Sequence, residues 1–181
     1  MPGHAEQVLQ RVRSRPPTLG TGRLVCVDGP AGSGKTTLAA RTAELAPGTV
    51  VVHTDELLEG WSGLPGLAAS VEGLLRPLAA GRPGRWRRWD WWADDWAETH
   101  TVEPGGLLVL EGVGSAPASC SDLIGCLVWV EAADPAVRLA RGLARDGEQM
   151  RPQWEQWMRD EAALHATEGT RDRADLVVTT G

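Results

Sequence analysis

The sequence of 181 residues contains no phenylalanine, tyrosine or asparagine and only one isoleucine, and Lys35 is the single lysine among 18 basic residues. The missing or rare types have AT-rich codons, so this composition indicates either a GC-rich genome or deliberate recoding. Under such a bias arginine replaces lysine wherever charge alone is needed. Lys35 is therefore predicted to lie where a compact ammonium group is required and a planar guanidinium does not fit.

Long apolar runs are also missing. No stretch approaches the roughly 18 residues of a membrane-spanning helix, and the N-terminal region lacks the apolar core of a signal peptide. Three cysteines form no metal-ligand pattern, and the four histidines have no partner at ligand spacing. We therefore expect a cytoplasmic protein that does not associate with a membrane and does not bind a transition metal.

The balance of charge excludes another class of partner. The formal net charge is −6, whereas binding to nucleic acid requires a basic face that neutralises phosphates. A chain of this length is expected to form one domain with a substantial core. Residues 1–22 are interpreted as an N-terminal leader, with a short helix at 4–13, and residues 23–181 as the main domain.

The most informative stretch is Gly29–Thr36, which fits the pattern G-x-x-x-x-G-K-[ST] at every fixed position. An apolar run, Leu24–Val27, precedes it and predicts a buried strand, and a helical pattern over Thr37–Leu45 follows. This setting predicts a phosphate-binding loop, because glycines let N–H groups converge on a phosphate at a helix N-terminus. A chance glycine-rich turn is the alternative. The predicted nucleotide contacts are Gly29, Ala31, Gly32, Ser33, Gly34, Lys35, Thr36 and Thr37.

Carboxylates follow two further predicted strands. Asp55 comes after the β-branched run at 49–54, and Glu111 comes after the apolar run at 107–110. In open parallel sheets the ligand lies beyond the carboxyl ends of the strands. Asp55 is thus predicted to be the general base for an attacking hydroxyl, or else a helix cap. Glu111, with the Thr36 hydroxyl, is predicted to bind Mg²⁺, or else to form a salt bridge.

A tryptophan-rich segment follows a predicted helix at 67–80. Five tryptophans occur within the eleven residues 86–96, interleaved with arginines and aspartates. The segment is interpreted either as a site that stacks a base or sugar and pairs with a phosphate, or as an insert that packs its own indoles and covers the acceptor. Binding to nucleic acid is disfavoured by Asp90, Asp94 and Asp95.

The C-terminal third predicts a pair of helices and a last strand. Asp134-Pro135 is typical of a helix start, and the helix carries Arg138, Arg141 and Arg145 on one face. Those arginines are expected either to bind an anion or to form a solvated face with Asp134, Asp146 and Glu148 as counter-ions. A fourth strand over 123–130 leads to Glu131, a further acidic candidate. Residues 170–173, before the strand at 175–179, are predicted to contact the nucleotide base.

In this order, these blocks resemble the uridine kinase and phosphoribulokinase-like P-loop kinases. The resemblance covers about residues 23–179. The matching blocks are Val27–Gly29 with the phosphate loop, Asp55-Glu56, Trp89-Asp90 in place of Tyr-Asp, Leu110–Gly112, the arginine helix through Asp146, and Ala174–Val178. Two departures lie on the acceptor side. Asp94 and Trp96 stand near where the family has a histidine and an arginine, and Leu57-Leu58 stand where it has an aromatic pair.

The resemblance implies an α/β fold of three layers, a P-loop NTPase with a five-stranded parallel sheet flanked by helices. It also implies an arginine-bearing helical lid at about 138–152, an acceptor cover at about 60–100, and Mg·ATP as the donor. By position, Asp55 would be the catalytic base, and Arg88, Trp89 and Asp90 would contact the acceptor. Arg138 would contact the nucleotide phosphates, while Lys35, Arg141 and Arg145 would act on the transferring group.

The sequence therefore predicts a Mg²⁺- and ATP-dependent kinase that phosphorylates a hydroxyl of a small molecule, with a nucleoside or nucleoside-like compound as the first choice. A nucleoside monophosphate kinase is one alternative, with a second phosphate site at Arg85, Arg87 and Arg88. A regulatory switch that hydrolyses ATP slowly is the other. The sequence makes no prediction of the oligomeric state.

Overall fold

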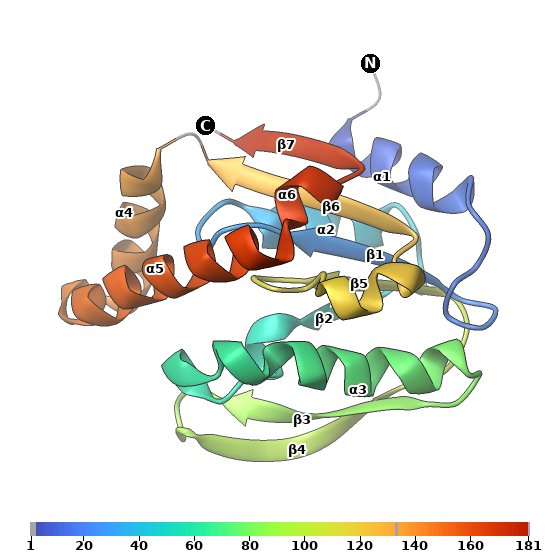
Figure 1. Ribbon diagram of the computed structural model, residues 1–181, viewed down its shortest axis with the longest axis horizontal. Helices are drawn as coiled ribbons and strands as arrows, with labels where there is room; N and C mark the ends of the chain where they lie inside the picture. Colours follow the sequence, from blue (N-terminus) through green and yellow to red (C-terminus); the bar gives the residue numbers. More distant parts are fainter. Residues whose placement is uncertain (1–2, 133, 181) are drawn as a thin grey trace.

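A five-stranded parallel sheet forms the centre of the computed structural model, which describes residues 3–132 and 134–180 (Figure 1). The strand order is β2-β5-β1-β6-β7, and each neighbouring pair is parallel. In that order the strands are Val50–His53, Leu107–Glu111, Arg23–Asp28, Cys126–Ala132 and Leu176–Thr180. The predicted sheet is confirmed.

Side chains alternate between two cores along the central strand β1. Leu24 and Cys26 belong to one apolar cluster, and Val25 and Val27 belong to the other. A strand buried on both faces reads as a continuous apolar run, which is why this strand could be predicted from sequence. The alternation gives the protein its three layers, with the sheet in the middle.

Helices cover both faces of the sheet. The helices α1 (His4–Arg13) and α2 (Lys35–Glu44) pack on the face of Val25 and Val27. The helix α3 (Leu67–Ala79) packs on the opposite face, together with Trp157 of α5 (Arg151–Glu168). The N-terminal helix that we predicted is thus part of the core, because Val8 and Val12 are fully buried against the sheet.

The helix α4 (Pro135–Asp146) stands beyond the carboxyl ends of the strands, where it pairs with the first turns of α5 (Figure 1). Its predicted start is confirmed, because the Asp134 side chain accepts a hydrogen bond of 2.8 Å from the N–H of Ala136. The short helix α6 (Thr170–Arg173) joins α5 to β7. Short 3-10 helices occupy Thr54–Glu56, Gly60–Ser62, Leu64–Gly66, Ala118–Leu123 and Glu148–Met150.

The tryptophan-rich segment is an antiparallel hairpin of β3 (Gly84–Asp90) and β4 (Asp95–Val102), and it forms a separate two-stranded sheet. The hairpin packs against α3 (Figure 1). The approach is close, since a Cβ on Gly84 would lie 2.5 Å from the Leu74 carbonyl oxygen. The sequence predicted an insert here but no strands. Across the described residues, no helix combines the length and apolarity that crossing a bilayer demands.

Candidate active site

The phosphate loop connects β1 to α2, as predicted. Gly34 caps the helix in the left-handed conformation, with φ of 96°, so the first N–H groups of α2 are directed toward the loop. Lys35 opens the helix, is 7% exposed, and donates a hydrogen bond of 2.8 Å to the Pro30 carbonyl oxygen. Burial lowers the pKa of Lys35, while the carboxylates of Asp28, Glu111 and Glu161 oppose this effect. The loop therefore carries one compact cation at its base.

Glu111 reaches the phosphate loop because β5 lies next to β1 in the sheet. The strand register places Glu111 beside Val27, and Glu111 Oε1 accepts a hydrogen bond of 3.1 Å from the Thr36 hydroxyl. The same carboxylate oxygen bonds to His53 Nδ1, and this bond raises the pKa of His53. The Thr36 and Glu111 side chains thus present adjacent oxygen atoms, which is the donor type that Mg²⁺ prefers.

Asp55 lies in the 3-10 turn that follows β2, so it also stands at the carboxyl edge of the sheet. The residue keeps solvent access, but partial burial by the surrounding elements raises its pKa. The carboxylates of Glu111 and Glu56 raise the pKa further, while His53 and Arg145 lower it. The backbone carbonyl of Asp55 accepts a hydrogen bond of 3.1 Å from Trp91 Nε1, which ties this turn to the hairpin.

Two of the three lid arginines bond to the phosphate loop. Arg138 Nη1 donates to the carbonyl oxygen of Ala31 at 3.1 Å, and Arg141 Nη1 donates to that of Gly32 at 2.9 Å. Gly32 has φ of 76°, and a Cβ there would lie 2.9 Å from the Arg138 carbonyl oxygen, so only glycine permits this approach of α4. The lid therefore rests directly on the loop.

Arg145, the third arginine of that helix face, has partners outside the phosphate loop. It pairs with Asp146 at 2.7 Å, and its guanidinium lies 5.6 Å from the ring centroid of Trp154. Arg145 also interacts electrostatically with Asp55. It is thus the lid arginine associated with the predicted base.

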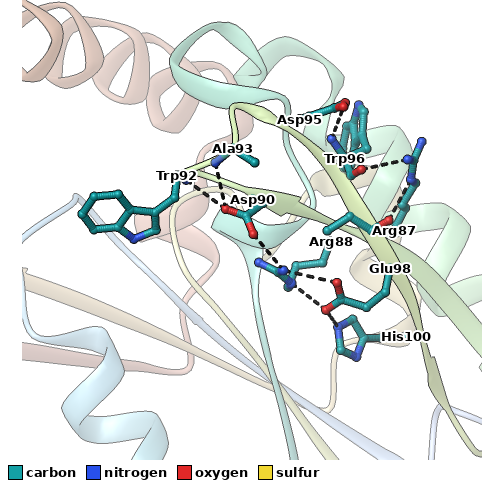
Figure 2. A network of polar contacts seen from close by, with 10 residues as sticks. Arg87, Arg88, Asp90, Trp92, Ala93, Asp95, Trp96, Glu98 and His100 are labelled. Carbon is teal, nitrogen blue, oxygen red and sulfur yellow. Dashed lines mark hydrogen bonds and ion pairs between the residues drawn. The ribbon is translucent and has the colours of Figure 1, made fainter.

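Two of the hairpin residues predicted to contact the acceptor, Arg88 and Asp90, belong to a polar network within the hairpin (Figure 2). Arg88 pairs with Asp90 at 3.1 Å and with Glu98 at 2.7 Å. The other oxygen of Asp90 accepts the N–H groups of Trp92 and Ala93, which fixes the hairpin turn. These contacts lower the pKa of Asp90, with the bond from Ala93 as the largest cause.

The tryptophans of this region differ in exposure. Trp89 is 5% exposed and packs edge-on against Trp96, so its indole serves the hairpin itself. Trp92 is 100% exposed, and Figure 2 shows its ring directed away from the rest of the drawn network. Trp61 connects the elements, because its ring meets Trp91, Trp154 and Trp157 edge-on at 5.7–5.9 Å. The hairpin and the lid thus share one indole cluster close to Asp55.

A hollow of about 850 Å³ opens beside the phosphate loop, which lines it with Gly32 and Gly34. Its walls come from the start of α1, from Thr37 and Leu38 of α2, from α4, and from Val178 and Thr180 of β7. Residues 170–173, which were predicted to contact the base, do not line it. Arg171 instead pairs with Glu131, whose carboxylate is thereby engaged at the surface.

No protein-family model and no curated protein matches the sequence. Solved structures do resemble it over nearly its whole length. A candidate fructose transport system kinase from a Silicibacter species superposes with a TM-score of 0.65 at 22% identity, covering 98% of this chain and 99% of its own. A candidate uridine kinase from Bacillus stearothermophilus gives 0.63 at 19% identity, covering 96% and 97%. D-Glycerate 3-kinase from Cryptococcus neoformans gives 0.54 at 14% identity, covering 95% and 90%.

The chain has the fold of the uridine kinase-like P-loop kinases. Within this P-loop kinase fold, Lys35, Thr36, Glu111 and Asp55 gather at the carboxyl edge of the sheet, because they follow the adjacent strands β1, β5 and β2.

Three residues contribute to the site although the sequence motifs assigned them no role. Asp28 is fully buried and accepts hydrogen bonds from the N–H groups of Gly29, Gly114 and Ala116. His53 holds Glu111. Glu161, on α5, is 1% exposed. The sequence did contain a signal for two of these residues. Asp28 is an acidic residue that ends a buried strand, and Glu161 is an acidic residue within an apolar stripe of a helix.

Proposed function

We propose that this protein is a Mg²⁺- and ATP-dependent kinase that transfers the γ-phosphoryl group to a hydroxyl group of a small molecule. One observation carries the proposal. A compact cation (Lys35), a pair of oxygen ligands of the type that Mg²⁺ prefers (Thr36 with Glu111) and a carboxylate of raised pKa (Asp55) occur together at the carboxyl ends of three adjacent strands. Phosphoryl transfer needs these three groups in this proximity.

Each residue has a defined task in this reaction. The loop N–H groups and Lys35 bind the donor phosphates and offset the negative charge that builds up during transfer. Asp55 accepts the proton of the acceptor hydroxyl. Its raised pKa makes the carboxylate a stronger base for this step. Arg141 and Arg145 approach from the lid, where they stabilise the transferring group and exclude water.

The cofactors fit the residues present. Mg²⁺, when bound, neutralises phosphate charge and orients the γ-phosphate, and the Thr36 and Glu111 oxygens would hold it. Among the described residues, no group of three histidine, cysteine, aspartate or glutamate side chains forms a metal site. The remaining ligands would therefore be phosphate oxygens and water, as is usual for Mg²⁺. The hollow beside Thr37 and Thr180 is of a size suited to adenosine.

The acceptor is a small molecule with a free hydroxyl group, with nucleosides and nucleoside-like compounds as the first choice and Trp91 and Trp92 as added contacts. A phosphate-bearing acceptor would need free guanidinium groups on the hairpin. Arg88 is neutralised by two carboxylates, and Arg87 donates to the carbonyl oxygens of Trp96 and Ala97. Of the three arginines of the alternative phosphate site, two are therefore engaged within the hairpin, and the exposed Arg85 alone is left for a phosphate. This favours a hydroxyl acceptor over a nucleoside monophosphate.

The test is ADP release from Mg·ATP in the presence of nucleosides, nucleoside monophosphates and small polyols. Wild type is compared with Lys35→Ala and with Glu44→Gln, a matched control at the exposed end of α2. We expect one hydroxyl class to stimulate ADP release by wild type and Glu44→Gln but not by Lys35→Ala. Tight ATP binding without stimulation by any acceptor would overturn the proposal and favour a regulatory switch.

A further inference from the structure

Glu161 connects the lid to the phosphate loop. It lies on α5, it is 1% exposed, and each of its carboxylate oxygens has a separate partner. Oε2 accepts a hydrogen bond of 2.8 Å from the N–H of Ala31, and Oε1 accepts one of 2.6 Å from Arg138 Nη1. One buried carboxylate therefore binds both the loop and the first helix of the lid.

Arg138 completes the connection. The Nη1 group that pairs with Glu161 also donates to the Ala31 carbonyl oxygen at 3.1 Å. The N–H and the C=O of Ala31 are thus held by the two members of one ion pair, which come from different helices. This arrangement fixes the orientation of the peptide groups on both sides of Ala31, in the part of the loop where α4 touches Gly32.

Stability alone does not account for this pair. Taking two charges out of water is costly, and apolar residues of similar volume in place of a buried ion pair are often neutral or stabilising. A carboxylate beside a phosphate loop also repels the phosphates that the loop binds. Glu161 thus opposes the binding of a polyanion. Its charge also helps to keep Lys35 protonated, but Asp28 and Glu111 exert that effect more strongly. The two specific bonds of the Glu161 carboxylate therefore point to a benefit in geometry.

We propose that Glu161 is a positioning residue of the phosphate site. Its carboxylate holds the Ala31 peptide groups and the Arg138 guanidinium in one fixed relative position. Through this contact, the lid helices and the phosphate loop keep a single relative arrangement as the transferring group is aligned. The kinetic consequence rests on the proposed kinase function, whereas the contact between Glu161 and Ala31 does not.

The first test needs no nucleotide. In the free protein, the Ala31 amide proton is followed by NMR in wild type, in Glu161→Gln, and in Glu155→Gln as a matched change at an exposed position of the same helix. A hydrogen bond to a charged acceptor is roughly twice as strong as one to a neutral acceptor. We expect an upfield shift and faster solvent exchange at Ala31 in Glu161→Gln only. An unchanged Ala31 signal overturns the proposal.

The second test separates positioning from stability. Glu161→Gln should lower kcat by about 10²-fold, the scale expected for a small misplacement of reacting groups. The KM for Mg·ATP should stay level or fall, because a negative charge has been removed. The double variant Arg138→Gln/Glu161→Gln removes both charges and so leaves no unpaired buried charge. It should therefore regain thermal stability but not kcat.

The outcomes are distinct. Recovery of kcat together with stability in the double variant would reduce the pair to a structural contact and overturn the proposal. Absence of acceptor-dependent turnover in wild type would count against the kinase function, and the NMR comparison would still decide whether Glu161 orders Ala31.

Discussion

The Thr36 hydroxyl lies 3.1 Å from Glu111 Oε1, which joins the first turn of α2 to the end of β5. These residues are 75 positions apart in the sequence, and the parallel pairing of β1 with β5 brings them together. The contact connects an oxygen of the phosphate loop to an oxygen of a neighbouring strand. A cation bound by one of these side chains would therefore be within reach of the other.

Removal of the Thr36 hydroxyl or of the Glu111 carboxylate should weaken the binding of Mg²⁺. For Glu111→Gln and Thr36→Val, we expect the Mg²⁺ concentration for half-maximal turnover to rise by about tenfold or more, the lower end of the effect of disturbing a metal site. Titration of kcat with Mg²⁺ measures this. Glu131→Gln is the control, because Glu131 lies on β6, which β1 separates from β5, and it pairs with Arg171. An equal rise in the control would exclude a specific role for Glu111.

Lys35 should be indispensable for turnover. In Lys35→Ala, we expect kcat to fall by at least about 10²-fold, since a buried cation aimed at developing charge is lost. Thermal unfolding of the same variant shows whether the fold persists without this charge. A folded variant with normal turnover would refute the assignment of the phosphate loop.

Asp55→Asn tests the proposed base. The substitution preserves size and removes the proton acceptor, so kcat should fall by roughly 10²–10⁴-fold. The affinity for ATP, measured by calorimetry, should be nearly unchanged, because Asp55 faces the acceptor side. The alternative role as a helix cap does not fit, because Asp55 is the middle residue of the turn at 54–56 and His53 occupies its N-cap position. Unchanged turnover, or loss of the fold, would instead indicate that Asp55 has only a structural role in that turn.

The pH dependence of turnover follows from the raised pKa of Asp55. A general base works only when deprotonated, so kcat should rise with pH through a pKa above the ordinary aspartate value of 3.8. His53 lowers the pKa of Asp55, so His53→Gln should move this acidic limb to higher pH. A kcat profile recorded between about pH 4 and pH 8 measures the shift. A limb that stays in place in His53→Gln would contradict the assignment.

Trp92 should affect the acceptor and not the donor. Its indole is fully exposed, and its neighbour Trp91 bonds to the backbone of Asp55. We expect Trp92→Ala to raise the KM of the acceptor by about two- to tenfold, the effect of an aromatic contact of about 0.5–1.5 kcal/mol. Trp92→Phe should retain most of the affinity. A change in the KM of ATP instead would place the indole on the donor side.

The donor half of the site was predictable because its signals are local. The loop pattern, the apolar strands and the acids that end them all lie within short stretches, and one rule of parallel sheets brings their ends together. The hairpin at 84–102 was not predictable in the same way. A bulge between Arg87 and Trp89 interrupts the alternation of side chains, and the turn has Asp94 at φ of 52° where glycine or asparagine would signal a turn.

The contacts of the lid depend on tertiary structure. The spacing of Arg138, Arg141 and Arg145 placed them on one helix face, as observed, but their partners lie far away in the sequence. Glu161 is 23 residues from Arg138 and 130 from Ala31. Within its helix Glu161 lies at helical spacing from the apolar residues Trp154, Trp157 and Leu164. Periodicity alone does not distinguish a buried acid with two partners from a solvated one.

The β3–β4 hairpin shares no strand pairing with the five-stranded sheet. A change in its length or sequence leaves the hydrogen bonds of that sheet as they are, provided that the packing on α3 is kept. The hairpin does contact the Asp55 turn, through Trp91. Under the proposed function, a changed hairpin therefore alters the acceptor side through that turn, while the pairing of β1 with β5 still sets Thr36 beside Glu111 on the donor side.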